Sequence, residues 1–155
     1  MSSDDVQARL DDLERRVAAL EGRPAATREP SGDVIEYAGS LSEPFELAWQ
    51  IRADPAQVLE LPDAPRTEVL AALGHPLRAA LVRRLAESGP ATGAELQQAA
   101  GLGSPGQLYH HLKGLTGCGL VEQDKRGSYR LRPQATVPAL VLLTAASDIA
   151  GQLRG

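Results

Sequence analysis

The sequence predicts a mainly α-helical protein with small β elements. Apolar residues recur at helical spacing through most of residues 66–117, which indicates a series of amphipathic helices. Two runs that alternate with period 2, at 120–122 and 128–131, indicate a short pair of strands after those helices. Because 43% of the residues are hydrophobic and only 3% are aromatic, the predicted core consists of Leu, Val and Ala.

Residues 1–22 are expected to form a coiled-coil helix. Its apolar residues are spaced alternately by four and three positions, as in a heptad seam: Val6, Leu10, Leu13, Val17 and Leu20. Asp4 and Asp5 suit the positive end of the helix dipole, and Gly22 and Pro24 mark the helix end. Since so few heptads are marginal alone, the helix is interpreted as accessory to a dimer. The alternative is a single amphipathic helix that packs on its own domain.

Residues 23–33 have the composition of a linker, and residues 34–65 predict a β-hairpin followed by a short helix. Phe45 and Trp49, the only phenylalanine and tryptophan, fall on one face of the second predicted strand. We expect this face to be core or dimer contact, and the alternative is the lining of an effector pocket. An isolated hairpin is marginal in water, so it must pack on another element.

Residues 66–133 predict helices over 66–73 and 77–88, then a third helix that begins at Thr92 and a longer fourth helix, which are joined by a tight turn. Thr92 and Glu95 form a capping-box sequence at the start of the third helix. Gly101 to Gly103 supply the tight turn, and Ser104 with Pro105 begins a helix that runs to about residue 117. Helices in this order, followed by two strands, are typical of a winged helix-turn-helix domain.

The helix after the tight turn is predicted to enter the major groove of DNA. Leu108, Leu112 and Leu115 form its buried side. The opposite face carries Gln107, His110 and Lys113. Glutamine pairs with adenine, and His or Lys reaches guanine or phosphate, so these residue types suit recognition of bases and backbone.

The predicted wing has a basic tip, Lys125-Arg126-Gly127, which suits phosphate or minor-groove contact, and Arg130 lies on its second strand. The full chain has a net charge of −4, but residues 66–133 hold 9 Lys+Arg against 5 Asp+Glu. Residues 1–65 hold 6 Lys+Arg against 14 Asp+Glu, so the acidity lies in the N-terminal part. The alternative is that the basic patch is only a solvated surface.

Residues 134–155 predict a closing helix over 137–153, with Pro138 in its first turn. The helix is apolar nearly all round and must therefore be buried. Burial against its twin in a homodimer is the expected arrangement, and packing under the hairpin within one subunit is the alternative.

The segment from Ala72 to Pro133 resembles the ArsR-type winged-helix repressors. The Gly-His-Pro-Leu-Arg step at 74–78, the His-His-Leu-Lys sequence at 110–113 and the Gly-Leu-Val entry to the wing at 119–121 carry the resemblance. It implies a homodimer on a near-palindromic operator in double-stranded DNA. The base-reading positions of the family correspond to Gln107, Tyr109 and His110, and its backbone contacts to Ser104 and Lys113. Tyr109 is bulkier than the usual residue, and residues 92–96 lack the cysteines of metal-sensing members.

Other classes of protein are less consistent with the sequence. Its three histidines are scattered along the chain and Cys118 is its only cysteine, so we expect no metal site, no cofactor and no disulfide. No catalytic motif is present, so the chain is not expected to be an enzyme. No secretory signal or membrane span is predicted, which favours a cytoplasmic, nucleoid-associated protein. A winged protein-interaction module that does not bind DNA is the second hypothesis, and an unknown small-molecule effector near Phe45, Trp49 and the closing helix remains open.

Overall fold

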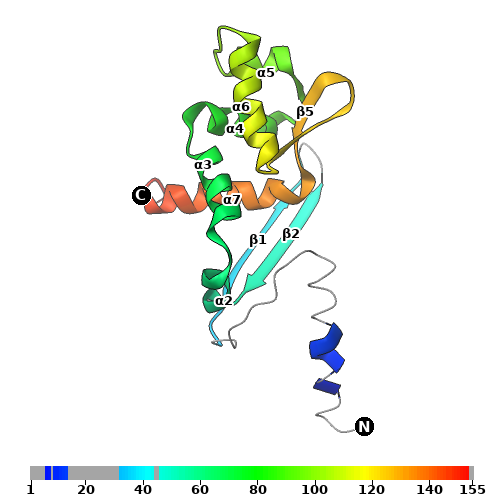
Figure 1. Cartoon of the computed structure of the whole chain (residues 1–155), viewed down its shortest axis with the longest axis vertical. Coiled ribbons are helices and arrows are strands. Elements are labelled where there is room, and N and C mark those ends of the chain that lie inside the picture. Colours follow the sequence, from blue (N-terminus) through cyan, green and yellow to red (C-terminus); the bar gives the residue numbers. More distant parts are fainter. Residues whose placement is uncertain (1–5, 8, 14–31, 44–45, 154–155) are drawn as a thin grey trace. The chain divides into compact units, whose positions relative to one another are not determined.

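The computed structural model describes residues 6–7, 9–13, 32–43 and 46–153 (Figure 1). The chain divides into two compact units, one of residues 1–35 with 52–61 and one of residues 36–51 with 62–155. In the first unit, residues 6–7 and 9–13 are helical, and α2 spans Pro55–Glu60. Val6, Leu10 and Leu13 are exposed, while Val17 and Leu20 lie outside the described residues, so the coiled coil stays a prediction.

The predicted hairpin is present and precedes the helical core in the sequence. Strand β1 spans Ile35–Leu41 and strand β2 spans Leu47–Ala53, and together they form a two-stranded sheet. Half-buried and exposed residues alternate along both strands, as expected for a sheet with one packed face. Gly39 lies on that face, where an added Cβ would be 2.8 Å from Cγ1 of Val137. The hairpin therefore approaches the C-terminal helix more closely than a side chain at position 39 would permit.

The helices of the central domain follow the prediction closely. They are α3 (Asp63–Leu73), α4 (Pro76–Ser88), α5 (Gly93–Ala99) and α6 (Pro105–Gly117). Helix α3 begins three residues earlier than predicted, because Pro65 lies in the first turn, where the backbone N–H has no helical partner. The sequence predicts Leu96, Ala99 and Ala100 as the buried side of α5; Leu96 is buried and Ala100 is half-buried, but Ala99 is exposed, so the prediction for Ala99 was wrong.

The wing is a small antiparallel sheet beside α6 (Figure 1). It consists of β4 (Val121–Gln123) and β5 (Ser128–Leu131), joined through a 3-10 turn at Lys125–Gly127. Val121 pairs with Leu131, and Gly127 has a φ of 75°, a conformation that favours glycine at the tip. Strand β3 (Ala91–Thr92) was not predicted; it is only two residues long and pairs with the far edge of β5.

The hydrophobic core lies where α3, α4, α5, α6 and the wing meet. Its buried members are Ala72, Leu81, Val82, Leu85, Ala91, Leu96, Leu108, Leu112, Leu115, Leu120, Val121, Leu131 and Ala139. All are Leu, Val or Ala, which confirms the predicted composition. Burial of such side chains supplies the main stabilisation of the domain, at about 25 cal/mol per Å² of apolar surface.

The C-terminal helix α7 spans Pro133–Ile149 and begins four residues before its predicted start. Pro133 occupies the first turn, so Pro138 lies inside the helix and the prediction that it belongs to the first turn was wrong. Proline has no backbone N–H, so Pro138 cannot donate a hydrogen bond to the carbonyl of Gln134. Gln134 is exposed, and water can hydrate this carbonyl. The N-terminal half of α7 holds the buried Val137 and Ala139, whereas Ile149 is 87% exposed. No described helix is both long and apolar enough to cross a membrane.

Candidate nucleic-acid interface

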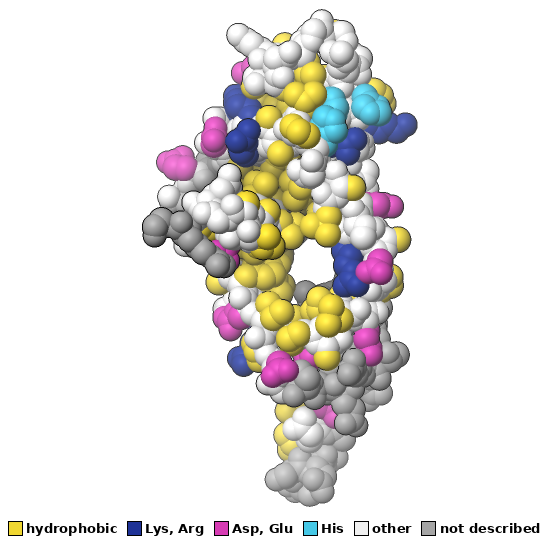
Figure 2. All heavy atoms as spheres, turned by 90° about the vertical axis from the view of Figure 1, so that its left-hand side faces the viewer, with side chains coloured by type: hydrophobic (Ala, Val, Ile, Leu, Met, Phe, Trp, Pro, Cys, Tyr) yellow, Lys and Arg dark blue, Asp and Glu magenta, His cyan; other side chains and the backbone are white. Residues whose placement is uncertain are grey.

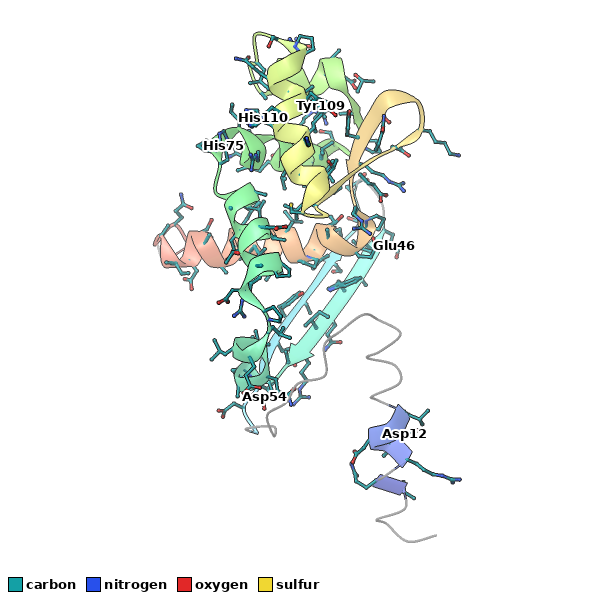
Figure 3. The ribbon with its side chains drawn as sticks, viewed as in Figure 1. Asp12, Glu46, Asp54, His75, Tyr109 and His110 are labelled. Atoms are coloured by element: carbon teal, nitrogen blue, oxygen red, sulfur yellow. The ribbon has the colours of Figure 1, made fainter. Side chains whose placement is uncertain are left out.

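Helix α6 presents a polar face at helical spacing. Gln107, His110 and Lys113 are all exposed and lie three residues apart, so they share one side of the helix. Figure 3 shows His110 and Tyr109 on this helix, with His75 at the neighbouring start of α4. These side chains can therefore reach a ligand that lies along the helix without any change in the fold.

The orientation of α6 is fixed from its opposite side and from its start. Leu108, Leu112 and Leu115 are 5%, 3% and 0% exposed, so rotation of the helix would bring apolar surface into water. At the start, Ser104 Oγ accepts a hydrogen bond from the backbone N–H of Gln107 at 3.4 Å, and Pro105 follows in the first turn. Ser104 thus serves as the helix cap in this structure, and its half-buried hydroxyl is close to the end of the polar face.

Tyr109 projects to the side of α6 that faces the wing, at 66% exposure. It borders an open groove of ≈ 440 Å³ between α6 and the wing. The groove is lined by Tyr109, Leu112, Lys113, Thr116, Val121, Glu122, Gln123, Tyr129 and Arg132. Lys113 therefore belongs both to the polar face of α6 and to this groove.

The basic residues of the wing differ in their surroundings. Lys125 is exposed at the tip, whereas the side chain of Arg126 lies outside the described part of the chain. Arg130 does not extend alone into solvent: its Nε donates to Glu122 Oε1 at 2.8 Å, and its Nη1 is 4.0 Å from Asp124 Oδ1. Arg132, which the sequence interpretation left out, lies 3.7 Å from Glu122 Oε2 through its Nε. Arg130 and Arg132 are two residues apart, and in an extended strand this spacing places both side chains on the same face of the sheet. This spacing was the signal in the sequence that could have identified Arg132.

Three histidines that are separated in sequence come together at the junction of α4 and α6. The rings of His75 and His111 have centroids 4.6 Å apart, and those of His110 and His111 are 5.5 Å apart. These histidines are therefore separated in sequence but are neighbours in the fold. Figure 2 shows histidine side chains beside Lys and Arg side chains on one surface. Within the described residues, no three His, Cys, Asp or Glu side chains are grouped so that they could hold a metal ion.

The histidine cluster has a structural role at two of its members. His75 caps α4, because its Nδ1 accepts from the N–H of Leu77 at 3.2 Å. His111 is buried, and its Nδ1 has no hydrogen-bond partner in the described structure. Burial lowers the pKa of His111 below its usual value, and electrostatic interactions with His75, Arg78 and His110 lower it further.

The lowered pKa of His111 predicts a loss of stability in acid. The unfolded chain binds a proton at position 111 near pH 6.5, whereas the folded chain resists protonation until a lower pH. The stability is therefore fully present above about pH 6.5 and is lost as the pH falls through the folded-state pKa. We expect urea denaturation to show a smaller fall in unfolding free energy for His111→Leu than for wild type between about pH 7.5 and pH 5. Equal falls in the two proteins would contradict this assignment.

The hairpin side of the second unit holds a smaller hollow of ≈ 160 Å³ between β1 and α7. It is lined by Ala38, Gly39, Ser40, Leu41, Val137, Leu140, Val141 and Thr144. Trp49 is half-buried and does not line the hollow, although its Nε1 has no hydrogen-bond partner in the described structure. Phe45 lies outside the described residues. The expectation of an effector near Phe45, Trp49 and the closing helix stays a prediction.

Residues 73–124 match a family model described as a helix-turn-helix domain. The matched segment contains α4, α5, α6 and the first wing strand, so it includes the polar face of α6 and Glu122. No curated protein matches the chain at a significant level.

Several solved structures are similar to this chain. The transcriptional repressor BigR from Xylella fastidiosa is 31% identical over 57% of this chain and 94% of its own, with a TM-score of 0.44. NolR from Sinorhizobium fredii is 22% identical over 64% of this chain and 95% of its own, with a TM-score of 0.49. The homodimeric winged helix-turn-helix DNA-binding domain of Mb0332 from Mycobacterium bovis, a possible ArsR-family transcriptional regulator, is 21% identical over 66% and 95%, with a TM-score of 0.49.

Because these TM-scores are below 0.5, the assignment of the fold depends on the family match and on the order of the helices and strands. The family match falls on the segment in which the Gly-His-Pro-Leu-Arg, His-His-Leu-Lys and Gly-Leu-Val sequences occur. The element order from α3 to β5 is that of a winged helix-turn-helix. The chain therefore contains a helix-turn-helix domain with the element order of a winged helix, which is the fold that the resemblance to the ArsR-type repressors implies.

Proposed function

We propose that this protein is a sequence-specific DNA-binding transcriptional repressor that acts as a homodimer on a near-palindromic operator. The observation that carries the proposal is the exposed face of α6, on which Gln107, His110 and Lys113 are held outward by the buried leucines behind them. Lys125 at the wing tip adds a positive charge beyond the helix. The arrangement suits a recognition helix in the major groove with a wing on the adjacent backbone.

Each proposed contact residue has a distinct task. Gln107 and His110 read base edges, with Tyr109 at their flank, and each well-paired base contact contributes on the order of 1–3 kcal/mol of discrimination. Ser104 and Lys113 contact the backbone, as do Lys125, Arg126 and Arg130 on the wing. Phosphate contacts of this kind supply affinity that falls steeply with salt.

The homodimer is supported by the apolar surface that one chain leaves exposed on α7. Ile149 is 87% exposed, Leu153 beyond the helix is 58% exposed, and Ala145 and Ala146 are exposed as well. A second copy would bury this surface and would place two recognition helices about one DNA turn apart, roughly 34 Å. The heptad residues at the N-terminus would add to the same association. In this proposal the dimer works in the cytoplasm, where the nucleoid is accessible to it.

A second candidate function is a winged protein-interaction module that does not bind DNA. The observation in its favour is that Arg130 and Arg132 are engaged by Glu122 and Asp124, which reduces the positive charge that the wing offers to a phosphate backbone. An unknown small-molecule effector is compatible with either function.

Selection of bound sequences from a random duplex library tests the proposal. We expect enrichment of an inverted repeat with half-sites about one turn apart, bound far more tightly than random DNA, and an affinity that falls with salt. Sedimentation of the protein alone should give the mass of two chains. Absence of enrichment, with only weak binding that disappears near physiological salt, would favour the protein-interaction function.

A further inference from the structure

Two arginines of the wing converge on one carboxylate. Arg130 Nε is 2.8 Å from Glu122 Oε1, and Arg132 Nε is 3.7 Å from Glu122 Oε2, so each oxygen of the carboxylate faces a different guanidinium. Asp124 lies 4.0 Å from Nη1 of Arg130 on the other side. Glu122 is thus the shared anion of the pair.

The strand register explains this convergence. Glu122 of β4 is directly opposite Arg130 of β5 in the antiparallel pair, and opposite residues project to the same face of a sheet. Arg132 follows Arg130 by two positions and reaches the same side, while its N–H donates to the carbonyl of Leu120. The wing backbone therefore holds the two guanidinium groups on either side of a single anionic position.

This anionic position borders the groove beside α6. Both Glu122 and Arg132 line the groove, together with Tyr109 and Lys113 from the helix. The ion pair is also accessible, because the side chains of Glu122, Arg130 and Arg132 are 34%, 41% and 45% exposed. Ion pairs that are this exposed are weak, so another anion can displace the carboxylate without a large change in structure.

We propose that the position of the Glu122 carboxylate, between Arg130 and Arg132, is the binding position of a DNA backbone phosphate. In the DNA-free protein the carboxylate occupies this position, and on DNA binding a phosphate replaces it between the two guanidinium groups. Planar guanidinium groups match the oxygens of phosphate as well as those of carboxylate. Glu122 therefore lowers the affinity of the wing for any DNA sequence. This inference rests on the proposed DNA-binding function.

The test compares Glu122→Gln with Glu87→Gln, an equal change of charge at an exposed residue of α4 outside the wing. Glutamine keeps the size of the side chain and removes its charge. We expect Glu122→Gln to bind random duplex DNA roughly three- to tenfold more tightly than wild type at low salt, and Glu87→Gln less than about twofold more tightly. Addition of Arg130→Gln to Glu122→Gln should remove the gain.

A second readout follows the ion pair without DNA. The ¹H–¹⁵N resonance of the Arg130 Nε–H should move upfield in Glu122→Gln and stay in place in Glu87→Gln, because an amide oxygen is a weaker acceptor than a carboxylate. Equal DNA affinities of the two variants, or an unmoved Arg130 resonance, would overturn the phosphate position while leaving DNA binding by the wild type intact. If neither wild type nor variants bind any duplex at low salt, the proposed function fails and this inference fails with it.

Discussion

Replacement of Leu115 by alanine is expected to lower the free energy of unfolding by about 2–5 kcal/mol. Leu115 is 0% exposed and lies on the face of α6 that packs into the core. The change removes buried methyl groups and leaves a cavity that the surrounding helices fill only in part. Since domains of this size are typically stable by about 5–15 kcal/mol, the loss is a large share of the total. Urea denaturation followed by circular dichroism measures it.

Leu59→Ala is the matched control for this prediction. Leu59 lies in α2 and is 74% exposed, so the same chemical change there removes little buried surface. We expect its effect to stay within about 0.5 kcal/mol. Similar losses in the two variants would show that Leu115 is not packed as described, and the orientation of the polar face of α6 would lose its support.

Helix α6 could be predicted from sequence because its signals are local. Ser104 and Pro105 mark the start of α6, and the spacing of Leu108, Leu112 and Leu115 marks its buried side. The capping box of Thr92 and Glu95 is likewise complete within four residues. In the structure Glu95 accepts from the N–H of Thr92 at 2.7 Å, and this bond and the bond from the Thr92 hydroxyl lower the pKa of Glu95.

The start of α7 was misplaced because two proline signals compete within it. Pro133 and Pro138 both fit the first turn of a helix, and the apolar run that predicts the helix begins beside Pro138. The structure begins the helix at Pro133, where Thr136 Oγ1 donates to the carbonyl of Arg132 and the buried Val137 faces the hairpin. The position of the hairpin against α7, a tertiary contact, is not contained in the local sequence.

The sequence predicted which charged residues lie in the site, but it did not predict which residues they contact. Arg130 was correctly located on the second wing strand, yet its partner Glu122 is eight positions away, and the pairing depends on the strand register. The histidine cluster depends in the same way on the approach of α4 to α6, which brings His75 to His111. Periodicity gives the side of an element on which a residue lies, but it does not give the residue that faces it.

Gln107→Ala and Arg126→Ala are expected to weaken DNA binding in different ways. Gln107 is exposed on the polar face of α6, where its amide can pair with a base. Its loss should reduce the preference for the selected operator over random DNA by about 1–3 kcal/mol, with little effect on random DNA itself. Arg126, at the wing tip, is proposed to contact the DNA backbone through its charge. Its loss should therefore weaken binding to both duplexes by a similar factor and reduce the salt dependence by about one phosphate contact.

The two variants act as controls for each other when both are titrated with the operator and with a random duplex at several salt concentrations. A base contact is specific because it depends on the donor and acceptor pattern of one base pair, whereas a phosphate contact is the same at every sequence. The ratio of the two affinities therefore separates the roles more clearly than either affinity alone. Equal losses on operator and random DNA for both variants would show that α6 does not read bases through Gln107. Gln107 and Arg126 would then both contribute to binding without regard to the DNA sequence.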